Sequence, residues 1–438
     1  MTLALDAPPR DQAQGIWSEA RQHARTGAQR GLGEFQSTGI IAPLLTAELP
    51  MTTFSALELR NGVVSFFGAA DFDERADGIS PRRLPAWTRA QVPKPMDVML
   101  RMPSGVRMAF STNASELRLL VQTTRMTTPP EAPRPAVFDL LLNGELRSEA
   151  FDRGNVIQLD RRDPTQFELV RGDAYEVLFS DLGTNKKHCE IWLPHNAFVE
   201  LRSLTLSDDA TLFPAPIPRE RRWLHYGSSI SHCMEATQPT GVWPAVAARK
   251  AGMHLQSLGF GGQCLLDQFV ARTIRDSDAD VISLKVGINV VNGDFMRERV
   301  FTSALHGFLD TIRDGKANTP IVLVSPIFCP SAETHPGPTV PNAEGRFVTL
   351  RGHEAIQNGS LTLTRVREII RGLVDARSSA GDAHLHYLDG LQLFNTADAS
   401  DLPDDLHPNP AGYARMGERF ASQVFGSDGL LRRARARQ

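Results

Sequence analysis

The sequence lacks any apolar run close to the roughly 18 residues that a membrane-spanning helix needs. It also lacks an excess of basic charge, with 47 Lys and Arg against 50 Asp and Glu and a formal net charge of -3. These absences argue against a membrane protein and against a nucleic-acid-binding surface. The opening stretch MTLALDAPPRDQAQG has no basic start followed by a long apolar core, so no secretory signal is recognised and a cytoplasmic location is predicted.

Cysteine is scarce as well. The spacing of the cysteines fits no zinc or redox motif, and a chain of this length does not need disulfides, so reduced thiols are expected. Cys233 and Cys264 are interpreted as small buried apolar residues. The pair His384 and His386 has no third ligand in view, so no metal site is predicted. The cysteines are Cys189, Cys233, Cys264 and Cys329.

With 438 residues, 41% hydrophobic and 22% charged, the chain has the composition of a globular protein with more than one domain. Residues 1–50 are rich in Ala, Gly, Arg and Gln and are expected to form a flexible extension, in which a short amphipathic helix is possible. We predict an accessory β-domain over residues 51–215 and a catalytic α/β domain over residues 220–430. A proline-rich linker, LFPAPIPRERR, lies between them.

The first predicted domain is dominated by runs of alternating apolar and polar residues. Such runs, bounded by Pro, Gly and Asp, are typical of short β-strands. The dipeptide Asn143-Gly144 separates two of them and indicates a hairpin. Many short strands at this spacing predict a β-sandwich or a jelly roll. The strands are expected at 106–113, 116–124, 137–151, 174–182 and 189–194.

After residue 220 strands alternate with helices, which predicts a parallel sheet covered on both faces. In such sheets ligands bind at the carboxyl ends of the strands. A loop at 329–361 is long enough to cover a site there. The expected strands are RRWLHYG, HLQSLG, DVISLKV, PIVLVSPIF and LHYLDG, and the expected helices are WPAVAARKAG, LLDQFVARTIRDSD, FTSALHGFLDTIRDG, TRVREIIRGLVDAR and PAGYARMGERFAS.

Four suggestive loops follow strands of this sheet: GSSIS (227–231), GFGGQ (259–263), GIN (287–289) and DDLHPN (404–409). Because the carboxyl ends of parallel strands share one rim, these loops are expected to converge. GFGG lacks the Lys-Ser/Thr of a phosphate-binding loop, so nucleotide binding is not expected.

The four loops contain what acyl transfer needs: a nucleophile, a base, a group that orients the base, and donors for an oxyanion. Asp404 and His407 lie three residues apart, so the carboxylate can reach Nδ1 and leave Nε2 free to take a serine proton. Gly262 can offer a backbone N–H and Asn289 a side-chain N–H, although Asn292 competes for that role. The first loop offers three hydroxyls, on Ser228, Ser229 and Ser231.

The blocks YGSSIS, GFGGQ, VGIN and DDLHPN resemble, in order, those of the SGNH (GDSL-type) esterase and acyltransferase superfamily. The resemblance covers residues 220–425 and implies a flavodoxin-like three-layer domain. It implies that Ser229 is the nucleophile, with Asp404 and His407 as its catalytic partners. It also implies an oxyanion hole formed by Ser229, Gly262 and Asn289. Ser228 departs from the family, which usually has Asp there; that position is outside the catalytic set.

The preceding β-domain and the loop SPIFCPSAETHPGPT narrow the resemblance to a two-domain branch, similar to bacterial carbohydrate esterases and to acyltransferases of secondary metabolism. It implies a serine esterase that cleaves small acyl esters, such as acetyl esters, of hydroxylated compounds through an acyl-enzyme. The alternative is transfer of the acyl group, from an ester or thioester, to the hydroxyl of a metabolite. Neither reaction requires a cofactor or a metal. A third hypothesis, a binding protein with a spent site, conflicts with the intact Ser229, Asp404 and His407.

Two further histidines lie near the first loop. His225 belongs to the preceding strand and His232 follows Ser229 by three residues. Either could line the pocket, but a packed or surface position is the favoured interpretation for both.

Overall fold

The structure is a computed structural model that describes residues 51–161, 163, 165–207, 209–216, 218, 220–352 and 357–435. The extension predicted at 1–50 lies outside the described residues. The described residues form one compact unit. Among the helices that the structure describes, none is long and apolar enough to cross a membrane.

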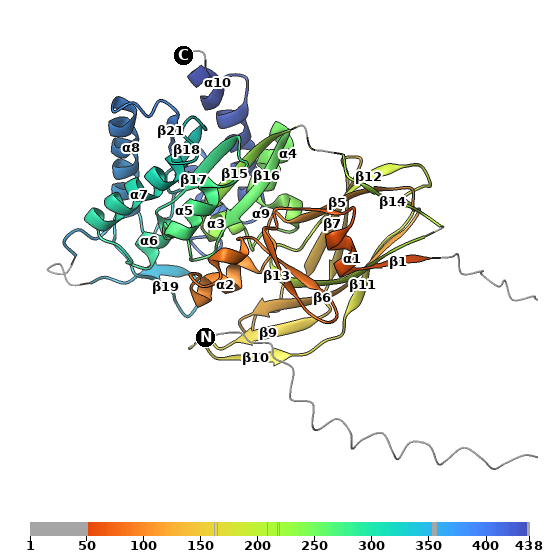
Figure 1. Ribbon diagram of the computed structural model, residues 1–438. Coiled ribbons are helices and arrows are strands. Elements are labelled where there is room, and N and C mark those ends of the chain that lie inside the picture. Colours follow the sequence, from red (N-terminus) through yellow and green to blue (C-terminus); the bar gives the residue numbers. More distant parts are fainter. Residues whose placement is uncertain are drawn as a thin grey trace, which may run out of the picture. The chain divides into compact units, whose positions relative to one another are not determined.

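Two β-sheets form the N-terminal part of this unit (Figure 1). The first has the order β10-β9-β6-β13-β4-β3, with β1 beside β13 and β11 beside β6. Its strands are β1 (Thr52–Ser55), β3 (Asp71–Glu74), β4 (Ile79–Arg82), β6 (Leu117–Thr127), β9 (Asn155–Leu159), β10 (Phe167–Val170), β11 (Tyr175–Phe179) and β13 (Ala197–Leu206). All of its pairings are antiparallel except that of β6 with β9.

The second sheet has the order β14-β5-β12-β7-β8, with β2 beside β5. Apolar side chains of both sheets, such as Phe110 and Val121, belong to one buried cluster, so the sheets share a core. Burial alternates along β11, as expected for a strand with one face in that core. The strands are β2 (Ser65–Phe67), β5 (Arg107–Thr112), β7 (Ala136–Leu142), β8 (Glu145–Phe151), β12 (Lys187–Trp192) and β14 (Leu212–Pro214).

The predicted hairpin at Asn143-Gly144 is confirmed. Strands β7 and β8 pair up to Leu142 and Glu145, and the two turn residues have φ of 51° and 94°. Positive φ at both positions is the reason for the Asn-Gly preference in such turns. The sequence analysis missed two helices in this region, α1 (Ala56–Asn61) and α2 (Lys94–Leu100). Helix α1 begins with a capping box between Ser55 and Glu58, a signal that the alternating pattern around it had hidden.

The predicted parallel sheet is present, with the order β16-β15-β17-β18-β21 (Figure 1). This is the flavodoxin-like order 2-1-3-4-5. Gly227 pairs with Gly259 where β15 and β16 end, so the loops that follow these strands begin side by side. The strands are β15 (Arg221–Gly227), β16 (Met253–Gly259), β17 (Val281–Lys285), β18 (Ile321–Val324) and β21 (Leu385–Leu388).

The helices fall into two groups. Helix α4 (Trp243–Ala251) packs against α9 (Pro410–Phe420), whereas α5 (Gln268–Arg275) packs against α7 (Glu298–Arg313), which contacts α8 (Leu363–Ser379). This grouping fits a sheet with helices on both faces, the predicted three layers. Helix α10 (Leu430–Arg435), near the C-terminus, was not predicted.

Two segments differ from their predicted form. The GIN block is the start of a short helix, α6 (Ile288–Asn292), rather than a loop. The segment 329–361 contains a small hairpin of β19 (Thr339–Pro341) and β20 (Phe347–Thr349). Three-residue strands leave too little period-two pattern to be recognised in the sequence.

Candidate active site

The three serines of GSSIS have different partners. Ser229 begins the short helix α3 (Ser229–His232), directly beyond β15. Ser228 caps this helix and accepts a hydrogen bond from the backbone N–H of Ile230 at 3.3 Å. The hydroxyl of Ser231 is buried and lies 2.8 Å from Nε2 of His225. Only Ser229 is partly exposed, and its Oγ lies 2.9 Å from Nε2 of His407.

Helix α3 lies close to the ends of β15 and β16 because both strands end in glycine. A Cβ at Gly227 would lie 2.2 Å from the Ser231 hydroxyl oxygen. A Cβ at Gly259 would lie 2.5 Å from the Ser231 carbonyl carbon. Both separations are below van der Waals contact, so a side chain at either position would displace the helix that carries Ser229.

His407 and Asp404 form the second half of the site. Nδ1 of His407 lies 2.7 Å from one carboxylate oxygen of Asp404. The other oxygen accepts hydrogen bonds from the backbone N–H groups of Leu406, at 2.9 Å, and His407, at 2.6 Å. Helix α9 follows at once, capped by Asn409. The structure therefore brings Asp404, His407 and Ser229 into one hydrogen-bonded chain across 178 residues of sequence.

The charges around the hydrogen-bonded residues suit His407 as a general base. Burial lowers the pKa of His407, but the charge of Glu235 and the hydrogen bond and charge of Asp404 outweigh it and raise the pKa above its ordinary value. Burial raises the pKa of Asp404, but the hydrogen bonds and charge of His407 bring it below its ordinary value. Asp404 therefore stays ionised and holds the imidazole with Nε2 toward Ser229.

The predicted oxyanion donors lie on neighbouring segments. Gly262 has φ of +67°, and no atom lies within 4 Å of where its Cβ would be. At the preceding Gly261, a Cβ would lie 3.8 Å from that of Ser229, which places this loop beside the serine. The side-chain oxygen of Asn289 accepts from the backbone N–H of Cys264 at 3.0 Å. Because this bond uses the oxygen, the NH₂ group of Asn289 is not engaged by it. The oxyanion roles of Gly262 and Asn289 stay predictions.

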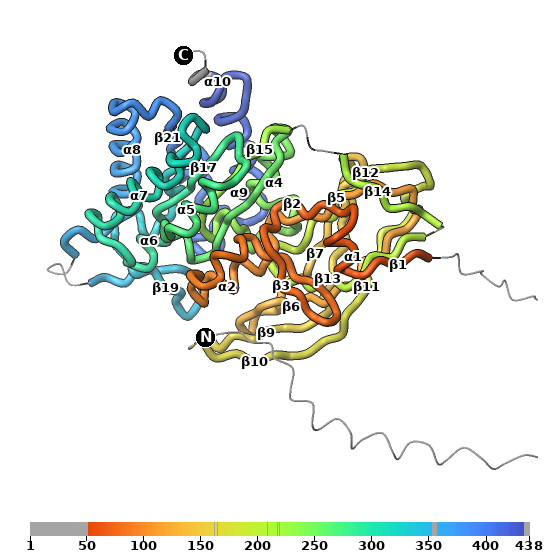
Figure 2. The backbone as a smooth tube through the Cα atoms, viewed as in Figure 1, coloured from red at the N-terminus to blue at the C-terminus, as the bar shows by residue number. Residues whose placement is uncertain are grey.

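The sequence analysis missed Arg83, which is fully buried beneath this loop. Its guanidinium donates to the carbonyls of Gly259, at 2.7 Å, and Met99, at 2.6 Å, and lies 3.2 Å from Nδ1 of His232. It also lies 4.8 Å from the ring centre of Phe260. In Figure 2 the orange segment with α2 lies near the green chain at the carboxyl ends of β15 and β16, where these contacts occur. The residues around Arg83 form no motif that would predict a contact with Gly259, 176 residues away in the sequence.

Two other missed residues lie against His407. Glu235 has a carboxylate oxygen 4.0 Å from Nδ1 of His407. The ring of Phe347, on β20, meets the imidazole edge to face at a centroid distance of 5.6 Å. The backbone N–H of Phe347 also donates to the carbonyl of Asp404 at 2.9 Å. The segment 329–361 therefore contacts the site, as its predicted covering role requires.

The remaining histidines and cysteines of this region are packed. His225 lies between the hydroxyls of Ser231 and Ser283, and His232 lies between Arg83 and the carbonyl of His195; both imidazoles are fully buried. The four cysteines are buried and free. Within the described ranges, no cluster of three or more His, Cys, Asp or Glu side chains could hold a metal ion.

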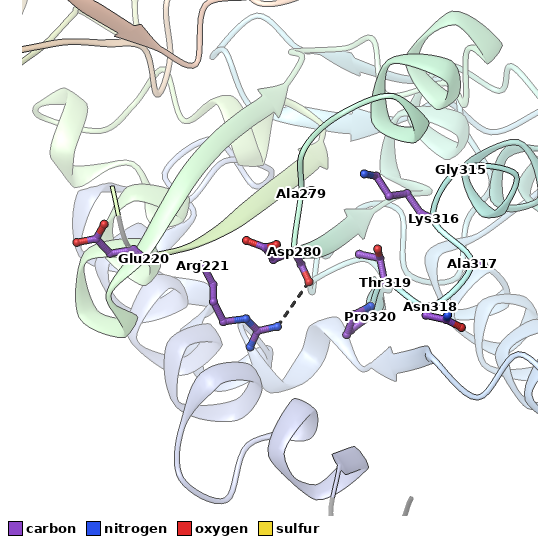
Figure 3. A pocket seen from close by; sticks show the side chains of 10 residues that line it. All are labelled: Glu220, Arg221, Ala279, Asp280, Gly315, Lys316, Ala317, Asn318, Thr319 and Pro320. Carbon is purple, nitrogen blue, oxygen red and sulfur yellow. Dashed lines mark hydrogen bonds between the residues drawn. The ribbon is translucent and has the colours of Figure 1, made fainter. Parts of the chain in front are cut away.

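A cavity of about 710 Å³ lies elsewhere, at the amino ends of the strands (Figure 3). Arg221 and Asp280 line it where β15 and β17 begin, together with residues 315–320, which precede β18. It is therefore at the opposite end of the sheet from Ser229, and it contains no serine or histidine. This cavity is not a candidate for the acyl-transfer site.

Comparisons with known proteins show which families and folds the chain resembles. The sequence model of the GDSL-like lipase/acylhydrolase family matches residues 225–415, and that of the SsfX3 N-terminal domain matches residues 64–202. The chain is 27% identical to the salicylyl-acyltransferase SsfX3 from a tetracycline biosynthetic pathway, with a TM-score of 0.69 over 84% of this chain and 95% of that one. No curated protein sequence matches the chain.

Two other solved structures share the fold. A candidate GDSL-like lipase from Bacteroides ovatus is 19% identical, with a TM-score of 0.61 over 85% of this chain and 96% of that one. An active-site mutant of a family two carbohydrate esterase from Clostridium thermocellum is 14% identical, with a TM-score of 0.54 over 83% of this chain and 98% of that one. The matches over residues 225–415 and 64–202 confirm the predicted resemblance to the GDSL-like (SGNH) esterases and acyltransferases, in a two-domain branch with an SsfX3-type N-terminal domain.

Proposed function

We propose that the protein is a serine esterase that cleaves small, acetyl-like acyl esters of hydroxylated compounds through an acyl-enzyme on Ser229. The observation that carries the proposal is the chain of hydrogen bonds from Asp404 through His407 to the partly exposed Ser229. The similarity to GDSL-like acylhydrolases and to the SsfX3 acyltransferase supports ester hydrolysis or acyl transfer in general. The substrate is a small molecule that contains an ester or thioester.

In the proposed reaction, Ser229 Oγ attacks the substrate carbonyl carbon while its proton passes to Nε2 of His407. The tetrahedral oxyanion is held by the backbone N–H groups of Ser229 and Gly262 and by the amide NH₂ of Asn289. When the intermediate collapses, His407 gives its proton to the departing alcohol oxygen, and the acyl group stays on Ser229. Water, deprotonated by His407, then attacks the acyl-enzyme, and His407 returns that proton to Ser229 Oγ as the acid is released.

Intact-mass measurement after treatment with a fluorophosphonate tests the nucleophile. Phosphorus bonds to an activated serine as fluoride leaves, so wild type should gain a single adduct that Ser229→Ala does not form. Ser231→Ala is a matched control because that serine is buried against His225. An adduct that persists in Ser229→Ala would move the nucleophile to Ser228 or Ser231, and its absence from wild type would favour a spent site.

Acyl transfer is the second candidate, and the similarity to the SsfX3 acyltransferase favours it. The acyl-enzyme is the same in both reactions, and the difference is whether water or a hydroxyl accepts the acyl group. Product analysis with 4-nitrophenyl acetate and increasing concentrations of an acceptor alcohol separates them. A transferase should form acetylated acceptor at the expense of acetate, whereas a hydrolase should release acetate throughout.

A further inference from the structure

His407 has two carboxylates on the same side of its ring. Asp404 makes the short contact of 2.7 Å with Nδ1, and Glu235 approaches the same nitrogen to 4.0 Å. A separation of 4.0 Å is too long for a hydrogen bond but short enough for a strong interaction between charges. Glu235 lies just beyond α3, so it comes from the segment that carries the nucleophile and not from the loop that carries His407.

Glu235 is held in this position by an independent contact. Its second carboxylate oxygen accepts a hydrogen bond of 2.7 Å from the hydroxyl of Tyr413. Tyr413 is fully buried in α9, the helix that begins three residues after His407. Burial and the charge of Glu235 raise the pKa of the Tyr413 phenol, so it stays protonated and remains a donor. The carboxylate is therefore tied to the element that carries the base.

The charges around His407 show what Glu235 can do. Asp404 and Glu235 are the anionic groups near it, and the guanidinium of Arg134 opposes them. Arg134 also donates to the backbone carbonyl of Glu235 at 3.2 Å. The imidazolium that forms when Ser229 loses its proton is largely but not fully buried, and this burial disfavours its charge. A second carboxylate offsets this penalty without competing for the Nδ1 hydrogen bond.

We propose that Glu235 is a positioning residue for His407: tethered by Tyr413, it supplies a second negative charge that stabilises the imidazolium formed during acylation and deacylation. Glu235 takes no proton in either step. The proton moves from Ser229, or from water, to Nε2 of His407 and then to the leaving oxygen. This inference rests on the proposed roles of Ser229, Asp404 and His407.

The test is the pH dependence of inactivation by a fluorophosphonate in wild type and Glu235→Gln. Neutral His407 is the reactive form, so inactivation falls as the pH drops through the pKa of His407. Loss of the Glu235 charge lowers that pKa. The acid limb of the variant, the part of its rate–pH profile where inactivation falls at low pH, should therefore move to lower pH. The plateau rate at high pH should fall about tenfold, because the imidazolium loses a stabilising charge.

Two further variants separate charge from packing. Glu235→Asp keeps the charge and should restore much of the wild-type acid limb. Tyr413→Phe removes only the tether, so its acid limb should lie between those of wild type and Glu235→Gln. A lower plateau in Glu235→Gln with an unmoved acid limb would show a merely structural role and overturn the inference. A wild-type profile in Glu235→Gln would overturn it too.

Ser229→Ala and His407→Ala distinguish this failure from failure of the proposed function. If both variants are inert and Glu235→Gln behaves as wild type, the inference about Glu235 alone is wrong. If Ser229→Ala is still labelled, the proposed nucleophile is wrong, and the inference about Glu235 is overturned with it. Thermal unfolding of each variant checks that it is folded.

Discussion

At the residue scale, the site combines one local pair, Asp404 and His407, with side chains from other parts of the chain. The spacing places the carboxylate of Asp404 against Nδ1 of His407 within one loop, and local geometry is what a sequence motif can specify. Glu235 and Arg83 could not be found in this way. Glu235 is far from His407 in the sequence and Arg83 is far from Ser229, and each is only a common residue type in its own surroundings.

His407→Ala is expected to reduce esterase activity at least about 100-fold, since a general base typically contributes that much. The fold should remain, because His407 is partly exposed and lies in a loop braced by the hydrogen bonds of Asp404. Hydrolysis of 4-nitrophenyl acetate and the melting temperature measure the two effects. A near-normal rate in a folded variant would remove His407 from the mechanism.

Lys285 provides a test of stability. It is fully buried at the end of β17, its Nζ has no hydrogen-bond partner among the described residues, and burial lowers its pKa to about 8. The folded protein therefore binds this proton more weakly than the unfolded chain does. The penalty is fully present below pH 8 and is relieved as the pH rises from about 8 toward the pKa of the unfolded chain.

We therefore expect Lys285→Met, which keeps an unbranched side chain without the charge, to raise the free energy of unfolding at pH 7 by about 1–3 kcal/mol. Urea denaturation at pH 7 and at pH 10 measures the free energy of unfolding of both proteins. The difference in favour of the variant should be smaller at pH 10. A variant less stable than wild type at pH 7 would show that the ammonium has a favourable partner.

At the scale of elements, the sequence predicted the strands and helices that carry the site because each has a clear period. The strands of the parallel sheet were expected as apolar runs, and the observed β15, β17 and β18 fall within those runs. The short elements α2, α6 and β20 were missed. The two helices span one or two turns and the strand spans three residues, which is too short for a clear hydrophobic period. Tertiary contacts therefore determine these elements.

Arg83 connects two parts of the site. It contacts Gly259, at the start of the Gly262 loop, and His232, in the helix that carries Ser229. In Arg83→Met we expect kcat to fall about tenfold with KM little changed, since small displacements of catalytic groups are costly. Added guanidinium at low millimolar concentration should restore part of the rate.

Arg82→Met is the matched control. Arg82 is also buried, but its guanidinium pairs with Asp73 and Asp97 and not with the loop. Its loss should affect stability more than kcat. Equal kcat losses in the two variants, with no response to guanidinium, would show that Arg83 does not act through the loop.

At the scale of the whole molecule, the predicted division at residues 215–220 stays a prediction, and side chains cross it extensively. Leu84, Met96, Leu100, Leu141 and Trp192 all belong to the apolar cluster of the parallel-sheet region. Contacts of this kind depend on how the two regions pack together, which one-dimensional periodicity does not specify. The N-terminal region therefore supplies part of the apolar core of the parallel-sheet region.

A fragment that begins at residue 220 should therefore fail as an independent enzyme. Without its N-terminal partner it would expose the apolar surface that these side chains cover, so we expect dye binding to that surface and loss of fluorophosphonate labelling. A fragment of residues 51–438 is the control and should be labelled at the full-length rate. Full labelling of the shorter fragment would show that the catalytic region folds alone.

The hydrogen bond between Ser231 and His225 has a consequence for histidine-directed chemistry. Two of the serine–imidazole pairs among the described residues have nearly equal lengths, 2.8 Å for Ser231 with His225 and 2.9 Å for Ser229 with His407. Burial lowers the pKa of His225 to about 3, whereas His407 is partly exposed. Diethyl pyrocarbonate needs an accessible neutral imidazole, so it should carbethoxylate His407 and spare His225. Contact with solvent, and not the distance to a hydroxyl, makes one of two similar pairs reactive.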